Sequence, residues 1–93
     1  MHCLVSYDIA DNKRRLKTSK ILDDYGKRVQ RSVFELAELK DKIWQDCQER
    51  LKKIELDDED SIRIYTICEA CRGKIIMLGN GPKPMDEPDV YII

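Results

Sequence analysis

Long apolar segments are absent from this chain of 93 residues, and their absence excludes a membrane-spanning helix. The longest uninterrupted apolar runs hold only a few residues, such as Ile75 to Leu78, whereas a span needs about 20. A basic segment followed by a long apolar stretch is also missing at the start, so we expect no secretory signal and a cytoplasmic location. In that reducing compartment four cysteines are expected to be thiols: Cys3, Cys47, Cys68 and Cys71.

A large net charge is missing as well, because 17 basic residues nearly balance 18 acidic ones to give −1. Taken alone, this balance argues against a nucleic-acid partner, since such domains usually carry a basic excess. The total conceals two opposed blocks. Residues 12–31 hold eight basic and two acidic side chains, a net charge of +6, whereas residues 32–60 carry −5. The positive block suits a phosphate backbone, and the negative block suits a partner protein.

Histidine and large aromatic residues are scarce. The single His2 has no Ser or Cys at a recognisable catalytic spacing, so we expect a residue of an edge strand rather than a general base. Trp44 and Phe34 are the only aromatic residues besides four tyrosines, and core packing is favoured for both. For Phe34 the alternative is a contact with a nucleic-acid backbone or base.

The spacing of apolar residues in the first half predicts alternating strands and helices. Residues 1–7 alternate like a strand, and a helix over about 12–25 follows, with Asp11 or Asn12 as its cap and a left-handed Gly26 as its end. Residues 27–35 are predicted as a second strand. The apolar residues that define a second helix recur at spacings of four and three: Leu39, Ile43, Cys47, Leu51 and Ile54.

The second half predicts strands over residues 62–67, 74–78 and 90–93, with the acidic turn 57–60 before the first of them. Three prolines between the last two strands exclude a helix there: Pro82, Pro84 and Pro88. This order predicts an α+β fold, an antiparallel sheet with two helices on one face. We expect one domain over residues 1–80, and a Pro-rich linker with a terminal strand over residues 81–93.

Two helices leave one face of such a sheet uncovered. A homodimer that packs sheet against sheet is the expected cover for that face. The terminal strand on its proline-rich linker could then add to the edge of the partner's sheet.

Asp8 follows directly on the first predicted strand, a position that suits a ligand of a hard cation. Mg²⁺ commonly uses only one or two protein carboxylates and can activate water for attack on a phosphodiester. The alternative, which spacing alone favours, is a carboxylate that caps the next turn. Two copies of Asp8 meeting at a dimer axis would make a stronger site.

Basic residues cluster on the first predicted helix. Lys13, Lys17 and Lys20 are spaced i, i+4, i+7 and form one stripe beside Arg14 and Arg15. A stripe of this kind suits phosphates, and a solvated helix face is the alternative.

The pair Cys68 and Cys71 has the spacing of a redox or zinc motif. A structural zinc site needs four ligands, so two of Cys3, Cys47 and His2 would have to lie near the pair. A redox motif should open a helix after a strand, whereas Gly73 and a further strand are expected here. Two ordinary thiols at a strand end are therefore favoured.

Three segments together resemble the CRISPR-associated protein 2 family: Tyr7-Asp8-Ile9, Lys13-Arg14-Arg15, and residues 26–35, which read G-x-R-V-Q-x-S-V-F-E. The length, strand order and final short strand agree with this family. The resemblance implies a ferredoxin-like homodimer in which Asp8, as catalytic residue and metal ligand, faces its counterpart across the dimer axis and binds Mg²⁺. It assigns no role to Cys68 and Cys71.

The resemblance also implies a function in antiviral defence. Members of the family are metal-dependent endoribonucleases on single-stranded RNA, and some cleave double-stranded DNA. They take part in spacer acquisition as the dimer that bridges the integrase, CRISPR-associated protein 1, so a non-catalytic adaptor is the alternative function. The resemblance and the basic stripe together predict these nucleic-acid-binding residues: Tyr7, Lys13, Arg14, Arg15, Lys17, Arg28, Arg31 and Phe34.

Overall fold

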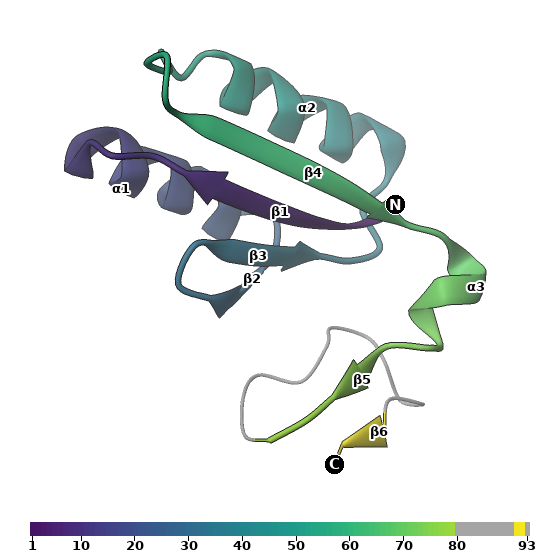
Figure 1. The fold of residues 1–93 in the computed structure, drawn as a ribbon. Helices are drawn as coiled ribbons and strands as arrows, with labels where there is room; N and C mark the ends of the chain where they lie inside the picture. Colours follow the sequence, from purple (N-terminus) through teal and green to yellow (C-terminus); the bar gives the residue numbers. More distant parts are fainter. Residues whose placement is uncertain (80–90, 93) are drawn as a thin grey trace.

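A four-stranded antiparallel sheet forms the centre of the molecule, with strand order β2-β3-β1-β4 (Figure 1). The computed structural model describes residues 1–79 and 91–92. The order of elements confirms the predicted α+β, ferredoxin-like arrangement. The four strands have these bounds: β1 His2–Asp8, β2 Lys27–Gln30, β3 Val33–Leu36 and β4 Ser61–Ile67.

Two helices, α1 (Asn12–Asp23) and α2 (Asp41–Lys52), cover one face of this sheet (Figure 1). The alternation in β1 explains which face they cover, because Cys3, Val5 and Tyr7 are buried against the helices while the residues between them point the other way. Of the two predicted caps of α1, Asp11 is the one used, and its carboxylate accepts a hydrogen bond from the Arg14 backbone N–H at 2.9 Å.

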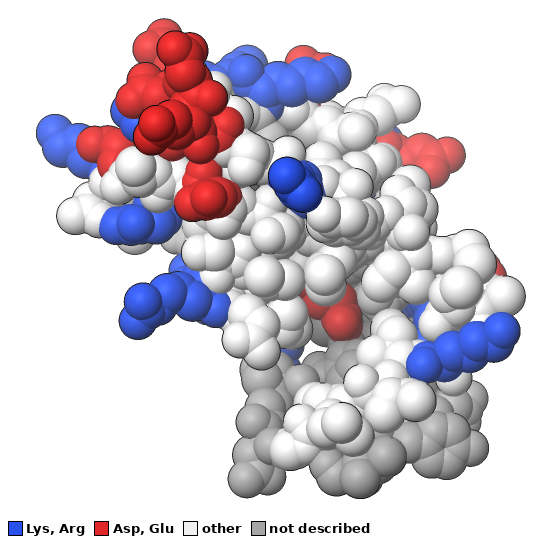
Figure 2. All heavy atoms as spheres, viewed as in Figure 1, with Lys and Arg blue, Asp and Glu red and all other residues white. Residues whose placement is uncertain are grey.

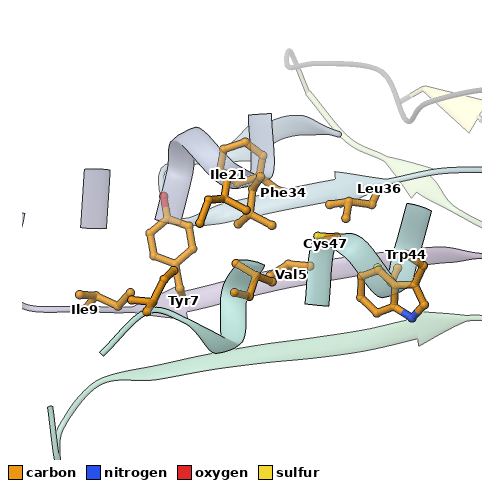
Figure 3. Close-up of a cluster of buried hydrophobic side chains, with 12 residues drawn as sticks. Val5, Tyr7, Ile9, Ile21, Phe34, Leu36, Trp44 and Cys47 are labelled. Carbon is orange, nitrogen blue, oxygen red and sulfur yellow. The ribbon is translucent and has the colours of Figure 1, made fainter. Parts of the chain in front are cut away.

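The core lies between the helices and the sheet (Figure 3). Ile21 and Leu22 enter it from α1, and Trp44, Cys47 and Leu51 enter it from α2. Each large apolar side chain buried in this way contributes roughly 1.5–3 kcal/mol. The predicted stripe of the second helix is confirmed at Cys47, Leu51 and Ile54, whereas Ile43 is exposed and Trp44 is buried, so Trp44 is a core residue as favoured.

The single strand predicted over residues 27–35 is wrong, because the chain reverses at residues 31–32 and forms the hairpin of β2 and β3. A register shift between Arg28 and Gln30 accompanies the reversal. The edge strand predicted for His2 is wrong too. β1 pairs with β3 on one side and β4 on the other, so His2 lies in a central strand and is buried.

Gly26 ends the first helix for a reason other than the predicted left-handed backbone. Among the described glycines only Gly79 has a positive φ. A Cβ on Gly26 would lie 2.3 Å from the carbonyl oxygen of Glu35 and 2.9 Å from the side chain of Leu36. The residue is a glycine because the entry to β2 passes too close to β3 for any side chain.

The chain beyond β4 forms a small separate sheet, in which β5 (Ile76–Met77) pairs in parallel with β6 (Tyr91–Ile92) of the same chain (Figure 1). The short helix α3 (Glu69–Arg72) connects β4 to this sheet. The strand predicted over 74–78 is thus shorter than expected, and the Pro-rich linker lies outside the described residues. Pairing of the terminal strand with a second subunit stays a prediction.

The helix α3 overturns one further expectation. The Cys68–Cys71 pair does open a helical turn directly after a strand, whereas the sequence predicts no helix at this point. Among residues 1–79 and 91–92, no helix is long and apolar enough to cross a membrane.

Candidate functional site

Asp8 is the last residue of the central strand β1 and is exposed on the face of the sheet opposite the helices. It pairs in register with Ser61, the first residue of β4. Because side chains alternate along a strand, Ser6 lies on the same face two residues earlier, and Arg63 is its partner on β4. This pairing sets the carboxylate of Asp8 beside two hydroxyls and a guanidinium.

These side chains border a hollow of about 260 Å³. Arg63 and Tyr65 of β4 form its far wall, and a hydrogen bond with Tyr65 raises the pKa of Arg63 further above its already high value. The arginine is therefore a permanent cation in the same hollow as the carboxylate. The complete lining is Ser6, Tyr7, Asp8, Ser61, Arg63 and Tyr65.

Asp60 joins the loop that follows β1 to the loop that precedes β4, and its side chain is only 2 % exposed. Its carboxylate accepts hydrogen bonds from the backbone N–H groups of Asp57 at 3.0 Å and Ala10 at 3.2 Å, and from Nε of Arg14 at 3.0 Å. The hydrogen bond from the Asp57 backbone, aided by that from Ala10 and by the Arg14 charge, holds the pKa of Asp60 below its usual range. These bonds fix the end of β1 relative to the start of β4.

A second hollow, of about 510 Å³, gathers three predicted arginines beside Tyr7: Arg15, Arg28 and Arg31. Arg28 donates a hydrogen bond to the backbone oxygen of Arg31 at 2.7 Å and lies over the ring of Phe34 at 5.1 Å. Both contacts hold the Arg28 side chain within the hairpin of β2 and β3. Three guanidinium groups around one hollow suit phosphate oxygens.

A third basic surface lies between α1 and α2. Its groove, also about 510 Å³, brings the stripe of Lys13, Lys17 and Lys20 together with Arg50 and Lys53 of the second helix segment. Arg50 is held in place by a 2.8 Å ion pair with Asp24. The predicted stripe is therefore wider than the sequence pattern of α1 alone implies.

Acidic side chains gather over the turn between α2 and β4, at the upper left of Figure 2. This is the acidic turn of residues 57–60, and Arg14 lies against it with Nη2 2.8 Å from Asp57 Oδ2. The central part of the sheet face in the same view carries mostly uncharged side chains (Figure 2). The two charge blocks of the sequence thus meet at Arg14 beside the end of β1.

A family model described as CRISPR associated protein Cas2 matches residues 1–75 of the chain. The chain belongs to the Cas2 family. It is 43% identical over its full length to the full length of the "CRISPR-associated endoribonuclease Cas2 1" of Chloroflexus aurantiacus. A "CRISPR-associated endonuclease Cas2 2" of Thermus thermophilus is 39% identical over 86% of this chain and 83% of its own length.

Solved structures agree with the assignment to Cas2. The crystal structure of Streptococcus pyogenes Cas2 at pH 6.5 matches 85% of this chain and all of its own chain, with a TM-score of 0.71 and 34% identity. A Thermus thermophilus protein designated TT1823 matches 89% of this chain and 95% of its own, with a TM-score of 0.74 and 39% identity.

Within this Cas2 fold, not every predicted contact residue is placed to reach a ligand. Phe34 is fully buried, and its ring packs 6.4 Å from that of Tyr7, so the predicted contact with nucleic acid is corrected to a core role (Figure 3). Arg14 forms ion pairs with Asp57 and Asp60. It orders the loops beside Asp8 rather than extending into a basic surface.

Some residues of these hollows were not found from the sequence. Ser61, Arg63 and Tyr65 approach Asp8 only through the pairing of β1 with β4, which joins residues more than 50 positions apart. Arg50 and Lys53 join the lysine stripe only through helix packing. The alternation of Ser61, Arg63 and Tyr65 along one predicted strand was the one available signal, since all three share a face.

Asp8 and its hydroxyl neighbours are the predicted metal-binding position. Among the residues that the structure describes, no cluster of three or more His, Cys, Asp and Glu side chains could hold a metal ion. A zinc site that unites Cys68 and Cys71 with His2, Cys3 or Cys47 is therefore not formed within the described chain. One exposed carboxylate flanked by hydroxyl oxygens fits a hard cation that keeps most of its waters.

Proposed function

We propose that this chain is a metal-dependent endonuclease that hydrolyses phosphodiester bonds, with single-stranded RNA as the first substrate class and double-stranded DNA as the second. The observation that carries the proposal is the hollow in which the carboxylate of Asp8 lies with the guanidinium of Arg63 at the end of the central strand. The names of the two relatives, an endoribonuclease and an endonuclease, support it.

Asp8 is the proposed catalytic residue and metal ligand, and Mg²⁺ is the proposed cofactor. The fit rests on the donor set, an exposed carboxylate with the hydroxyl groups of Ser6 and Ser61 beside it. Mg²⁺ bound there supplies a Lewis acid that neutralises phosphate charge and makes water a better nucleophile.

The side chains around Asp8 have separate tasks in this mechanism. Arg63 binds the non-bridging oxygens of the scissile phosphate and stabilises the negative charge that grows on them as water attacks phosphorus. Tyr65 holds Arg63 through their hydrogen bond. Arg14 and Asp60 keep the end of β1 at a fixed position, so that Asp8 is already in place when the substrate arrives.

The path of the nucleic acid follows from Tyr7, which lines both the hollow around Asp8 and the arginine hollow. A strand whose phosphates lie on Arg15, Arg28 and Arg31 therefore leads to the end of β1. Lys13 and Lys17 extend the positive surface on the other side of α1.

A homodimer completes the proposed site. One subunit offers a single carboxylate, and the face of the sheet that carries Asp8 also exposes Tyr65 and is not covered by α1 or α2. A second copy packed on this face would bring two Asp8 carboxylates to one axis. The terminal strand after residue 80 would then extend the partner's sheet.

To test this function, the purified protein is incubated with labelled single-stranded RNA or duplex DNA, in Mg²⁺ or in chelator, and cleavage is measured. We expect Asp8→Asn to lower the cleavage rate by at least about 100-fold, because several kcal/mol of metal-derived charge stabilisation is lost. Asp58→Asn is the matched control, since Asp58 is an exposed carboxylate of the acidic turn outside the hollow around Asp8.

The Asp8→Asn variant must remain a dimer of unchanged thermal stability for this result to count. Equal cleavage by wild type and Asp8→Asn in Mg²⁺, or full cleavage in chelator, would show that Asp8 is not the metal-dependent catalyst.

The second candidate function is a non-catalytic adaptor in spacer acquisition in the cytoplasm, where the dimer bridges CRISPR-associated protein 1. It is favoured by the separate basic and acidic surfaces, because one can hold nucleic acid while the other meets a partner protein. In spacer-acquisition assays the adaptor predicts full activity of Asp8→Asn, and loss of activity when Lys13 and Lys17 are changed to Glu. Loss in both variants would favour the nuclease.

A further inference from the structure

The exposed pair Cys68 and Cys71 occupies the only connection between the main sheet and the small sheet of β5 and β6 in the described chain. Cys68 follows the last residue of β4, and Cys71 lies within α3. The backbone N–H groups of Cys71 and Arg72 both donate to the carbonyl oxygen of Cys68 at 3.0 Å. A turn closed in this way keeps the two Cα atoms within about 7 Å, close to the range of about 4.4–6.8 Å that a disulfide spans.

The two neighbouring thiols also shift one another's ionisation. The Cys71 thiol, followed by the backbone N–H groups of Cys71 and Ala70, lowers the pKa of Cys68, whereas Cys68 raises the pKa of Cys71. A lowered pKa favours the thiolate of Cys68, the form that attacks a disulfide.

The remaining two cysteines show the opposite environment. Cys3 and Cys47 are fully buried in the core, and burial raises the pKa of each to about 11. A buried thiol of high pKa is both inaccessible and largely un-ionised at neutral pH. Reaction with a soluble thiol reagent is therefore confined to the pair at the start of α3.

We propose that Cys68 and Cys71 form a thiol–disulfide exchange site for small disulfides of the glutathione class, independent of the nuclease function. The Cys68 thiolate attacks one sulfur of oxidised glutathione, a mixed disulfide forms, and one glutathione thiolate leaves. Cys71 then gives up its proton and attacks the Cys68 sulfur, which forms the Cys68–Cys71 disulfide and releases the second glutathione. The two thiols lose two electrons, which oxidised glutathione gains, and the two protons end on the glutathione products.

The test uses the full reduced chain, incubated with mixtures of reduced and oxidised glutathione, quenched with acid and alkylated in denaturant. Intact mass and peptide mapping then count the free thiols and locate any disulfide. We expect two of the four cysteines to be protected as a Cys68–Cys71 disulfide without retained glutathione. Added reduced glutathione should restore all four thiols.

Two serine variants serve as controls for one another, because each removes one sulfur from the same exposed turn. Cys71→Ser should trap one glutathione on Cys68, since the resolving thiol is gone. Cys68→Ser should form a glutathione adduct on Cys71 but no intramolecular disulfide, because the attacking sulfur of the pair is gone. Circular dichroism checks that both variants keep the fold.

The proposal is overturned if all four cysteines of the wild type alkylate after oxidation, or if mapping finds another pairing. It is also overturned if Cys71→Ser retains no glutathione on Cys68, because Cys68 would then not be the attacking thiol. Should a variant fail to fold, the wild-type peptide map decides alone.

Discussion

Arg63 lies on the strand next to Asp8, and because its pKa is raised further by Tyr65 it is a cation at neutral pH. If it binds the scissile phosphate, Arg63→Ala should lower kcat by about 100- to 1,000-fold, the usual cost of removing one donor that stabilises transition-state charge. Arg63→Lys should recover part of the rate, because the charge remains but the two-pronged hydrogen bonding is lost.

Steady-state kinetics on single-stranded RNA separate this role from simple binding. An increase in KM with unchanged kcat in Arg63→Ala would mean that the arginine holds substrate without stabilising the transition state. Lys42→Ala, an exposed cation on the first turn of α2, is the control that should leave both constants unchanged.

At the level of single residues, the sequence predicts Asp8 and the arginines as site residues but does not reveal which side chains surround them. Phe34 follows three basic residues within the motif and was open to both interpretations, and only the hairpin turn shows that its ring faces the core. Arg14 stands among cations in the sequence, yet the loop before β4 brings two carboxylates to it. Such contacts join distant residues, and no local pattern encodes them.

Gly26 and Gly73 each lie between two elements, and alanine at the two positions should change the stability of the protein by different amounts. Gly26→Ala should destabilise the protein by about 1–3 kcal/mol, because the new methyl group would push β2 away from the Glu35 carbonyl. Gly73→Ala should change stability by less than about 0.5 kcal/mol, since nothing lies within 4 Å of its added Cβ and its φ of −71° suits any residue. Urea unfolding of the two variants beside wild type measures both effects, and equal effects would contradict the steric argument.

The loops that support the end of β1 should respond to acid through Asp60. Its pKa is lowered in the folded protein, so its ionised form stabilises the fold above its usual pKa of about 3.9, and this stabilisation is lost as the pH falls through the lowered folded value. Asp60→Asn should therefore lower Tm at pH 6, and the difference from wild type should shrink below about pH 4.

Thermal melts between about pH 2.5 and 7 measure this dependence, with Asp58→Asn as the control from the same turn. A difference in Tm that stays constant down to the lowest pH would mean that the Asp60 charge does not contribute, and that the variant acts through its shape.

Elements with strong periodicity were predicted well, and elements that depend on tertiary contact were not. The second helix and both sides of β1 follow from spacing alone. The β2–β3 reversal has no glycine or proline at residues 31–32 to indicate it, and it is held instead by the hydrogen bond from Arg28 and the backbone contact of Tyr7 with Ser32. The four-residue helix α3 is too short for periodicity to reveal.

The whole molecule carries a charge near zero because a basic face and an acidic turn cancel. If the basic face binds nucleic acid, the position of the charges decides affinity and the total does not. Two triple variants separate these possibilities, since each changes the net charge from −1 to −4: Lys13, Lys17 and Lys20 to Gln on the groove between α1 and α2, and Lys40, Lys42 and Lys74 to Gln elsewhere.

The groove variant should bind single-stranded RNA more weakly than wild type. The slope of log K against log salt should also be less steep, by about 0.7 for each phosphate that the variant no longer neutralises. The second variant should keep the wild-type slope, because its lysines lie outside the groove. Fluorescence anisotropy over a series of salt concentrations measures both slopes with the same RNA. Equal weakening in the two variants would mean that binding responds to the total charge of the molecule, and the groove would then have no special part in holding the substrate.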